Sequence, residues 1–211
     1  MHLLLTDRLA CPRCGPDFGL ILLAERMEDR RVLEGSFGCP NCRDAFPVTA
    51  GFGDLRAPPR RVVPEGLAGS PGAEPSDAAD AERILALLGI AQGPGTLALV
   101  GRPARHANAL AVAIEGIHVV AIDPDLDAWP GASGVSRMMA APGLPFFSRS
   151  LRGVAVDGRL GSDLVREAAR VVARLGRVVV VQAADGVDAI LEEVGLEILA
   201  SEATTVVAAR G

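Results

Sequence analysis

The most regular pattern of apolar and polar positions lies between residues 96 and 123. Residues 97–100 form a continuous apolar run that breaks at Gly101, residues 104–115 have helical spacing, and residues 117–122 form a second apolar run that ends at Asp123. Two apolar runs joined by a helix predict a pair of parallel strands that is buried on both faces. Such a pair places a ligand crevice at the carboxyl ends of its strands, and here those ends are Gly101 and Asp123.

Similar elements follow one another over the rest of the second half of the chain. A helix that Ser76 or Asp77 can cap is predicted to run through Leu88, where Gly89 ends it. The later elements are strands at 135–139, 154–157 and 177–182, helices at 163–175 and 186–194, and a closing hairpin of residues 196–199 with 204–209. Strands that alternate with helices predict a doubly wound α/β sheet.

Residues 57–75 separate this half from the N-terminal part. They are rich in proline and glycine, which argues against regular structure in the segment. The predicted organisation is therefore a small N-terminal domain of residues 1–56, a linker of residues 57–75 and a second domain of residues 76–211.

The four cysteines of the chain all lie in the N-terminal part, at Cys11, Cys14, Cys39 and Cys42. Two C-x2-C pairs with turn residues around them can offer four thiolates to one tetrahedral ion. Disulfides and a dithiol redox motif are the alternatives, and a chain expected in the cytoplasm argues against disulfides. The spacing predicts a structural metal site, with zinc preferred over iron.

The N-terminal part also resembles a known family. The spacer between the cysteine pairs has the pattern of a hairpin, and residues 9–14 (LACPRC) and 39–52 (CPNCRDAFPVTAGF) resemble the Trm112-like zinc-ribbon family. The resemblance covers about the first quarter of the chain, with Phe46 and Phe52 in place of the family's tyrosine and isoleucine. It implies a small β zinc ribbon of the kind that serves as a partner or activator of methyltransferases.

The second domain resembles another family. Residues 143–154 (GLPFFSRSLRGV), 167–172 (EAARVV) and 175–181 (LGRVVVV) resemble segments of class I (type 11) methyltransferases that use S-adenosylmethionine. The resemblance extends over residues 77–210 and implies a Rossmann-like methyltransferase sheet.

The departures from this second family fall where the cofactor would bind. Only Gly101 and Asp123 match its binding positions, as a loop glycine and the ribose-binding acid. Residues of other kinds replace the remaining contact residues at Leu99, Pro103, Arg105 and Ala140. The resemblance therefore implies a vestigial cofactor site that binds S-adenosylmethionine weakly or not at all.

Composition narrows the classes of function. The formal charge of −5 and the pI of about 5.3 argue against a nucleic-acid partner, and the absence of lysine excludes a Walker-type phosphate loop and a Schiff-base lysine. Neither a signal sequence nor an apolar stretch long enough to span a membrane is evident, so we expect a cytoplasmic chain without a membrane span. Arg102, Arg105 and His106 could bind an anion, although a solvated loop is the favoured interpretation.

These observations favour a non-catalytic protein that works by binding a protein partner, either a second copy of itself or a methyltransferase. The alternative is an active S-adenosylmethionine-dependent methyltransferase acting on a small molecule or RNA, and no catalytic residue is assigned. An RNA-binding module is disfavoured by the acidic charge and the lack of tyrosine. The apolar side chains Phe37, Phe46, Val48 and Phe52 could either form the partner surface or pack against the second domain.

Overall fold

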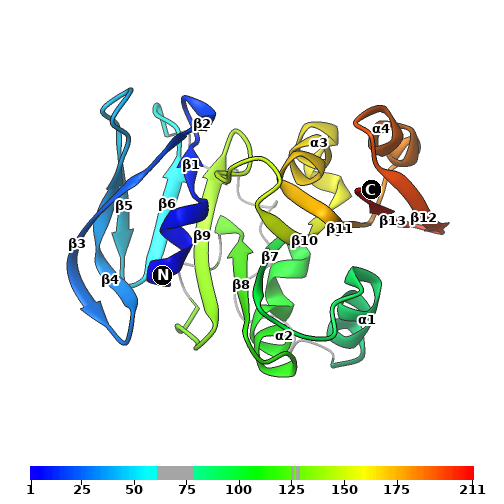
Figure 1. Cartoon of the computed structure of the whole chain (residues 1–211), viewed down its shortest axis with the longest axis horizontal. Coiled ribbons are helices and arrows are strands. Elements are labelled where there is room, and N and C mark those ends of the chain that lie inside the picture. Colours follow the sequence, from blue (N-terminus) through cyan, green and yellow to red (C-terminus); the bar gives the residue numbers. More distant parts are fainter. Residues whose placement is uncertain (61–77, 125, 127–128) are drawn as a thin grey trace.

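The computed structural model describes residues 1–60, 78–124, 126 and 129–211. Within these ranges one sheet of eleven strands, in the order β12-β13-β11-β10-β7-β8-β9-β6-β5-β4-β3, runs through the molecule (Figure 1). Its strands are β3 (Ile21–Glu28), β4 (Arg31–Gly38), β5 (Ala45–Thr49), β6 (Phe52–Arg56), β7 (Gly95–Val100), β8 (Ile117–Ile122), β9 (Val135–Ala141), β10 (Leu151–Asp157), β11 (Val172–Val181), β12 (Glu197–Glu202) and β13 (Thr205–Ala209).

The centre of the sheet is parallel, as predicted. β7 pairs with β8 and β10, β8 with β9 and β10 with β11, all in parallel register. β13 runs antiparallel beside β11 and β12 closes that edge, which confirms the predicted hairpin. Buried valine, leucine and alanine side chains fill these strands on both faces, as in parallel sheets that carry helices on both sides.

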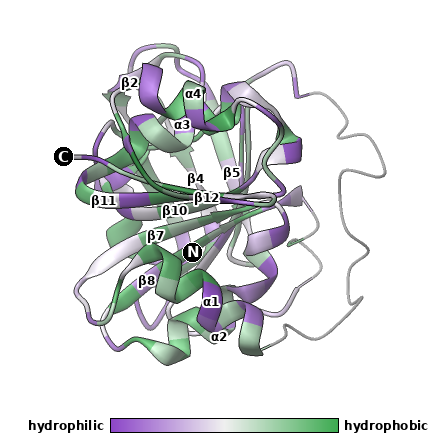
Figure 2. Ribbon diagram, turned by 90° about the vertical axis from the view of Figure 1, so that its right-hand side faces the viewer, coloured by the Kyte–Doolittle hydropathy of each residue, from purple (hydrophilic) through white to green (hydrophobic). Residues whose placement is uncertain are grey.

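Helices cover the two faces of this parallel part (Figures 1 and 2). α1 (Ala78–Leu88), α2 (Ala107–Ala113) and the short 3-10 helix η2 (Arg102–His106) pack on one face. α3 (Ser162–Val171) and α4 (Val187–Glu193) pack on the other. The predicted doubly wound α/β architecture is therefore confirmed, whereas the proposed caps Ser76 and Asp77 lie outside the described residues.

Two predicted helices end earlier than expected. The helix predicted over residues 104–115 is divided into η2 and α2, and it ends because Ile114 is extended. The helix predicted over residues 163–175 stops at Val171 because Val172 already pairs with Leu151 of β10. Strand β11 therefore starts five residues before the predicted position, and Leu175 within it has a φ of +63°.

The strands of the N-terminal part continue the same sheet. After η1 (Leu3–Arg8), β1 (Ala10–Cys11) and β2 (Gly15–Gly19), the strands β3 to β6 form an antiparallel meander, and β3 with β4 is the predicted hairpin. β6 then pairs in parallel with β9, with Leu55 opposite Ala140. The division into two domains stays a prediction, and residues 61–75 of the predicted linker lie outside the described residues.

The four apolar side chains considered for a partner surface are buried within the chain. Phe37, Phe46 and Val48 are at most 2% exposed and join the core under α3, and Phe52 is 5% exposed and joins the core under α1 and α2. Packing against the second half of the chain is therefore the correct interpretation for these residues. In the described residues, no helix is long and apolar enough to cross a membrane.

Candidate metal centre and cofactor crevice

The structure brings the four predicted cysteines together. Their sulfur atoms all lie within 4.8 Å of one another, with Cys11 Sγ 3.7 Å from Cys42 Sγ and Cys14 Sγ 3.8 Å from Cys39 Sγ. Four sulfurs bound tetrahedrally at about 2.3 Å from a zinc ion would lie about 3.8 Å apart. None of the four forms a disulfide. The cluster could therefore hold one metal ion.

Backbone and side-chain amides donate hydrogen bonds to the sulfur atoms of the cluster. The Cys14 N–H donates to Cys11 Sγ at 3.4 Å, and the side-chain amide of Asn41 donates to Cys14 Sγ at 3.3 Å. Burial raises the pKa of the Cys39 thiol, but hydrogen bonds from the backbone of Cys42 and Asn41 and from neighbouring thiols outweigh it, so this pKa is lowered to about 7. Burial raises the pKa of Cys11 and Cys42. The positive charge of a bound ion would lower the pKa of all four cysteine thiols and so favour their thiolate form.

The segment between β9 and β10 joins the cysteine-bearing part to the parallel sheet. The Ala10 N–H donates to the Pro145 carbonyl at 3.0 Å, the Phe147 N–H donates to the Arg8 carbonyl at 3.0 Å, and Leu9 forms a β-bridge with Phe146. This segment belongs to the stretch that resembles methyltransferases. In this chain it serves as a backbone partner for the strand that carries Cys11.

Glu167 and Arg170 of α3 hold this segment from the other side. The Arg170 guanidinium donates to the carbonyls of Leu144 and Phe146, each at 2.8 Å, and to the Glu167 carboxylate at 2.7 and 2.8 Å. Glu167 also accepts from the Leu144 N–H at 3.0 Å. Burial raises the pKa of Glu167, but its bonds to Arg170 and Leu144 outweigh burial and lower that pKa. The E-x-x-R pair therefore positions backbone rather than a cofactor.

The two predicted cofactor residues lie side by side at the carboxyl ends of adjacent strands. Gly101 follows β7, Asp123 follows β8, and the Gly101 N–H donates to the Ile122 carbonyl at 2.9 Å. The Asp123 N–H donates to the Met138 carbonyl at 3.1 Å, and its own carbonyl accepts from Leu126. The carboxyl ends of β7 and β8 are thus adjacent, as predicted, and a ligand crevice between them stays a prediction.

Protein atoms fill the space beside Gly101. The residue is buried with a φ of +72°, and a methyl group added to it would lie 2.8 Å from Leu160 Cδ1 and 3.0 Å from Asp157 Cβ. Asp157 is buried and accepts from the Arg159 backbone N–H at 3.1 Å and from Arg159 Nε at 2.9 Å. These contacts fix the turn after β10 beside the glycine.

The loop after Asp123 is tied to the N-terminal part by one buried arginine. Arg137 of β9 donates to the carbonyls of Leu126 and Trp129 in this loop, and to the Ala50 carbonyl between β5 and β6 at 3.1 Å. Ala140, one of the residues that depart from the resembled family, lies opposite Leu55 of β6. This side of the crevice is therefore built against the N-terminal strands.

One polar cluster was missed by the sequence reasoning. His2 and His118 have ring centroids 4.9 Å apart, and His118 Nε2 lies 2.9 Å from the hydroxyl of Ser136, which accepts from the His2 N–H. Burial and the neighbouring His2 lower the pKa of His118 to about 4. No local spacing could indicate this cluster, because its members are far apart in the sequence. His118 lies in β8, Ser136 lies in β9, and His2 lies just before η1.

Neither a protein-family model nor a curated protein sequence matches the chain. Among solved structures, a precorrin-6y C5,15-methyltransferase of Geobacter metallireducens is similar over 70% of this chain and 96% of its own, with 12% identity and a TM-score of 0.51. A chain of the complex containing the Trm112 methyltransferase activator of Haloferax volcanii is similar over 59% of this chain and 70% of its own, with 16% identity and a TM-score of 0.47. At such identities the likeness shows the fold alone, which is the Rossmann-like α/β fold of methyltransferases.

Proposed function

We propose that the chain is a zinc-binding, methyltransferase-like protein that has a degenerate cofactor site and acts as a partner or scaffold in a protein complex. The observation that carries the proposal is the packing of Leu160 and Asp157 over Gly101. In a cofactor-binding crevice of this fold, the missing side chain of the loop glycine lets a ligand approach the backbone. Here the same space holds side chains of the turn after β10.

Two further features of the loop after β7 support the loss of cofactor binding. Pro103, which is buried, has no backbone N–H to offer, and the positive charge of Arg105 opposes a sulfonium. Arg105 Nε donates to His106 at 3.2 Å, and its guanidinium lies 3.8 Å from Asp80. The loop therefore makes contacts within the protein where the family places contacts to the ligand.

Calorimetric titration with S-adenosylmethionine tests the degenerate site. We expect no binding tighter than about 100 μM. The decisive variant is Asp123→Ala, and the matched control is Asp163→Ala, whose carboxylate is fully exposed on α3. A low-micromolar dissociation constant that Asp123→Ala abolishes and Asp163→Ala preserves would reverse the proposal.

That reversal would favour the second candidate function, an active S-adenosylmethionine-dependent methyltransferase on a small molecule or RNA. The observation in its favour is the adjacency of Gly101 and Asp123 at the carboxyl ends of β7 and β8. This is the place where open α/β sheets bind their ligands.

The metal of the four-cysteine cluster is proposed to be zinc in a structural role. Four protein sulfurs complete a tetrahedral site, so no position remains for a substrate. The ion would join β1 to the turn between β4 and β5, which Arg13 and Asp44 also link at 2.9 Å. Elemental analysis of protein purified without chelator should give about one zinc per chain, and less than about half an equivalent of zinc or iron would count against the site.

The partner surface is proposed to be the free edge of β3. Ile21, Leu23 and Met27 of this strand are 56%, 60% and 41% exposed, and β3 is the last strand at one end of the sheet. An edge strand offers backbone donors and acceptors to a strand of another chain, and the apolar side chains beside them add buried area. The resemblance to Trm112-like proteins makes a methyltransferase one candidate partner, and a second copy of the chain is the other.

Light scattering and a pull-down from native cytosol test this surface. A partner predicts an oligomer that buries upward of about 1,000 Å². Leu23→Lys should weaken the assembly, whereas Leu175→Lys, which changes an 82% exposed leucine of β11 far from β3 in the strand order, should not. A monomer that recovers nothing above background would contradict the partner role.

A further inference from the structure

A cavity of about 310 Å³ lies beside the carboxyl end of β11, on the face covered by α1. Its walls come from α1, from η2, from the end of β11 and from the turn between β12 and β13. Neither Gly101 nor Asp123 lines it. Pro103 and Arg105 of the loop after β7 do line it, so the cavity adjoins the crevice of the proposed function. The inference rests on the arginines of the cavity and not on the degeneracy of that crevice.

The charge of this cavity is opposite to that of the whole protein. Arg83, Arg102 and Arg105 line it together with one acid, Asp80, in a chain with a formal charge of −5. The pair between Arg105 and Asp80 is long, at 3.8 Å, and the Asp80 side chain is 50% exposed, so the acid neutralises little of this charge. Within the described residues, the side chains of Arg83 and Arg102 make no hydrogen bond or ion pair, and both residues are exposed.

His106 lies next to Arg105 in this wall. It is 3% exposed, and its Nε2 accepts the hydrogen bond from Arg105 Nε at 3.2 Å. This bond also fixes the direction of the Arg105 guanidinium, one edge of which points toward Asp80. Sequence reasoning favoured a solvated loop here; Arg102 is exposed, Arg105 is half-buried and His106 is buried.

The remaining walls are of two kinds. Gln182, Thr204 and Thr205 provide an amide and two hydroxyls that can donate or accept hydrogen bonds. Apolar side chains, among them Ile84, Leu87 and Val181, line the rest. Guanidinium groups bind carboxylates and phosphates through paired N–H donors, and pockets for small ligands combine apolar walls with a few such groups.

We propose that this cavity is a binding site for a small organic anion with a short apolar body. Arg102 and Arg105, with Arg83, would hold its carboxylate or phosphate, and the apolar walls would enclose the body. A cation of the same shape would bind more weakly, because the positive charges of the arginines would repel it.

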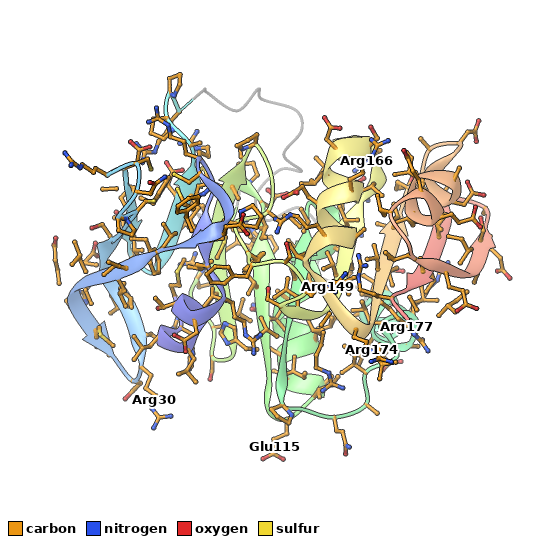
Figure 3. All side chains as sticks on the ribbon, turned by 45° about the horizontal axis from the view of Figure 1, so that its top comes forward. Arg30, Glu115, Arg149, Arg166, Arg174 and Arg177 are labelled. Atoms are coloured by element: carbon orange, nitrogen blue, oxygen red, sulfur yellow. The ribbon has the colours of Figure 1, made fainter. Side chains whose placement is uncertain are left out.

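An NMR titration of the full-length, isotope-labelled protein tests the proposal. The probes are n-hexyl phosphate, n-hexanoate and n-hexylammonium, which share an apolar body and differ in the charged group. The test variant is Arg102→Gln/Arg105→Gln, and the control is Arg174→Gln, which removes the same kind of charge at the other end of β11 (Figure 3). Far-UV circular dichroism verifies the fold, and Arg102→Gln alone, at an exposed residue, replaces the double variant if that variant does not fold.

We expect one anionic probe or both to bind saturably with a dissociation constant of about 1 mM or less, and the stronger of the two identifies the preferred group. The double variant should weaken binding at least about fivefold and Arg174→Gln should not change it, while n-hexylammonium should cause no saturable shifts. Three results would overturn the site: no saturable binding of either anion below about 10 mM, equal binding of n-hexylammonium, or binding that the arginine variant leaves unchanged. Failure of the degenerate-site proposal is read separately, from the titration with S-adenosylmethionine.

Discussion

Replacing Phe46 with alanine should destabilise the whole sheet, because this side chain belongs to the core that the N-terminal strands share with α3. Phe46 is 0% exposed and lies opposite Phe37 in the pairing of β4 with β5. A fully buried phenylalanine that removes about 150–200 Å² from water contributes roughly 4–5 kcal/mol at about 25 cal/mol per Å². Deletions of this kind in protein cores cost about 3–5 kcal/mol. We therefore expect Phe46→Ala to lower the urea midpoint by about 1–2 M.

Two probes show whether this loss reaches the second half of the chain. Trp129, the single tryptophan, reports on the loop after β8, and the reactivity of the four cysteines toward a thiol reagent reports on the N-terminal part. In Phe46→Ala both transitions should move together, because β6 pairs with β9 and Arg137 joins Trp129 to the N-terminal strands. Leu23→Ala, at a 60% exposed position, should cost well under about 1 kcal/mol. An unchanged Trp129 transition beside an earlier thiol transition would refute the reasoning, since the N-terminal part would then unfold alone.

Three other variants probe the packing around Gly101, the buried His118, and the bonds of Arg170 on α3 to the segment before β10. Gly101→Ala should cost about 1–2 kcal/mol more than Gly161→Ala, because both have positive φ but only Gly101 is packed against side chains; equal losses of unfolding free energy would mean that the space is open. The folded pKa of His118, about 4, lies below the usual 6.5, so stability should fall by up to about 3 kcal/mol as the pH drops through this window. His118→Gln should remove that part of the loss in urea titrations at about pH 7 and 4.5. Arg170→Met should cost about 2–4 kcal/mol. Arg166→Met, on the same helix, should cost about 0.5 kcal/mol or less in the same titrations, because its pairs with Asp163 of α3 and Glu193 of α4 are exposed (Figure 3).

The central parallel strands β7 to β11 could be predicted from the sequence because each contains a run of apolar residues, such as residues 97–100 of β7 and 178–181 of β11. The predicted bounds of β8 equal the observed Ile117–Ile122, and the other predicted strands differ from the observed ones mainly at their ends. The ends of helices were harder to predict. No residue between 172 and 175 forbids a helix by itself. The helix α3 nevertheless stops at Val171, because Val172 pairs with Leu151 of β10 in the sheet. A contact with a distant part of the chain thus overrides local preference.

Of the candidate site, the part that depends on local spacing was predictable. Two C-x2-C turns fix most of their own geometry, and only the pairing of the strands between them was needed to bring four sulfurs within 4.8 Å. The filling of the space over Gly101 depends on Leu160, in the turn after another strand, and no spacing indicates it. The same holds for the continuation of the sheet from β9 into β6, which places the predicted ribbon against the crevice.

The pair Glu167 and Arg170 of α3 explains why the sequence of the framework can resemble methyltransferases while the residues around the predicted crevice differ. Arg170 and Glu167 satisfy the backbone of Leu144 and the carbonyl of Phe146, both buried, and the same segment forms the bridge to Leu9. Leaving buried carbonyls without donors costs about 1–3 kcal/mol each. These residues are therefore needed whether or not a ligand binds, since they hold both the sheet and the strand that carries Cys11. The bonds of Glu167 and Arg170 hold the segment before β10, so the residues around Gly101 and Asp123 can differ from those of the resembled family while this part of the framework stays intact.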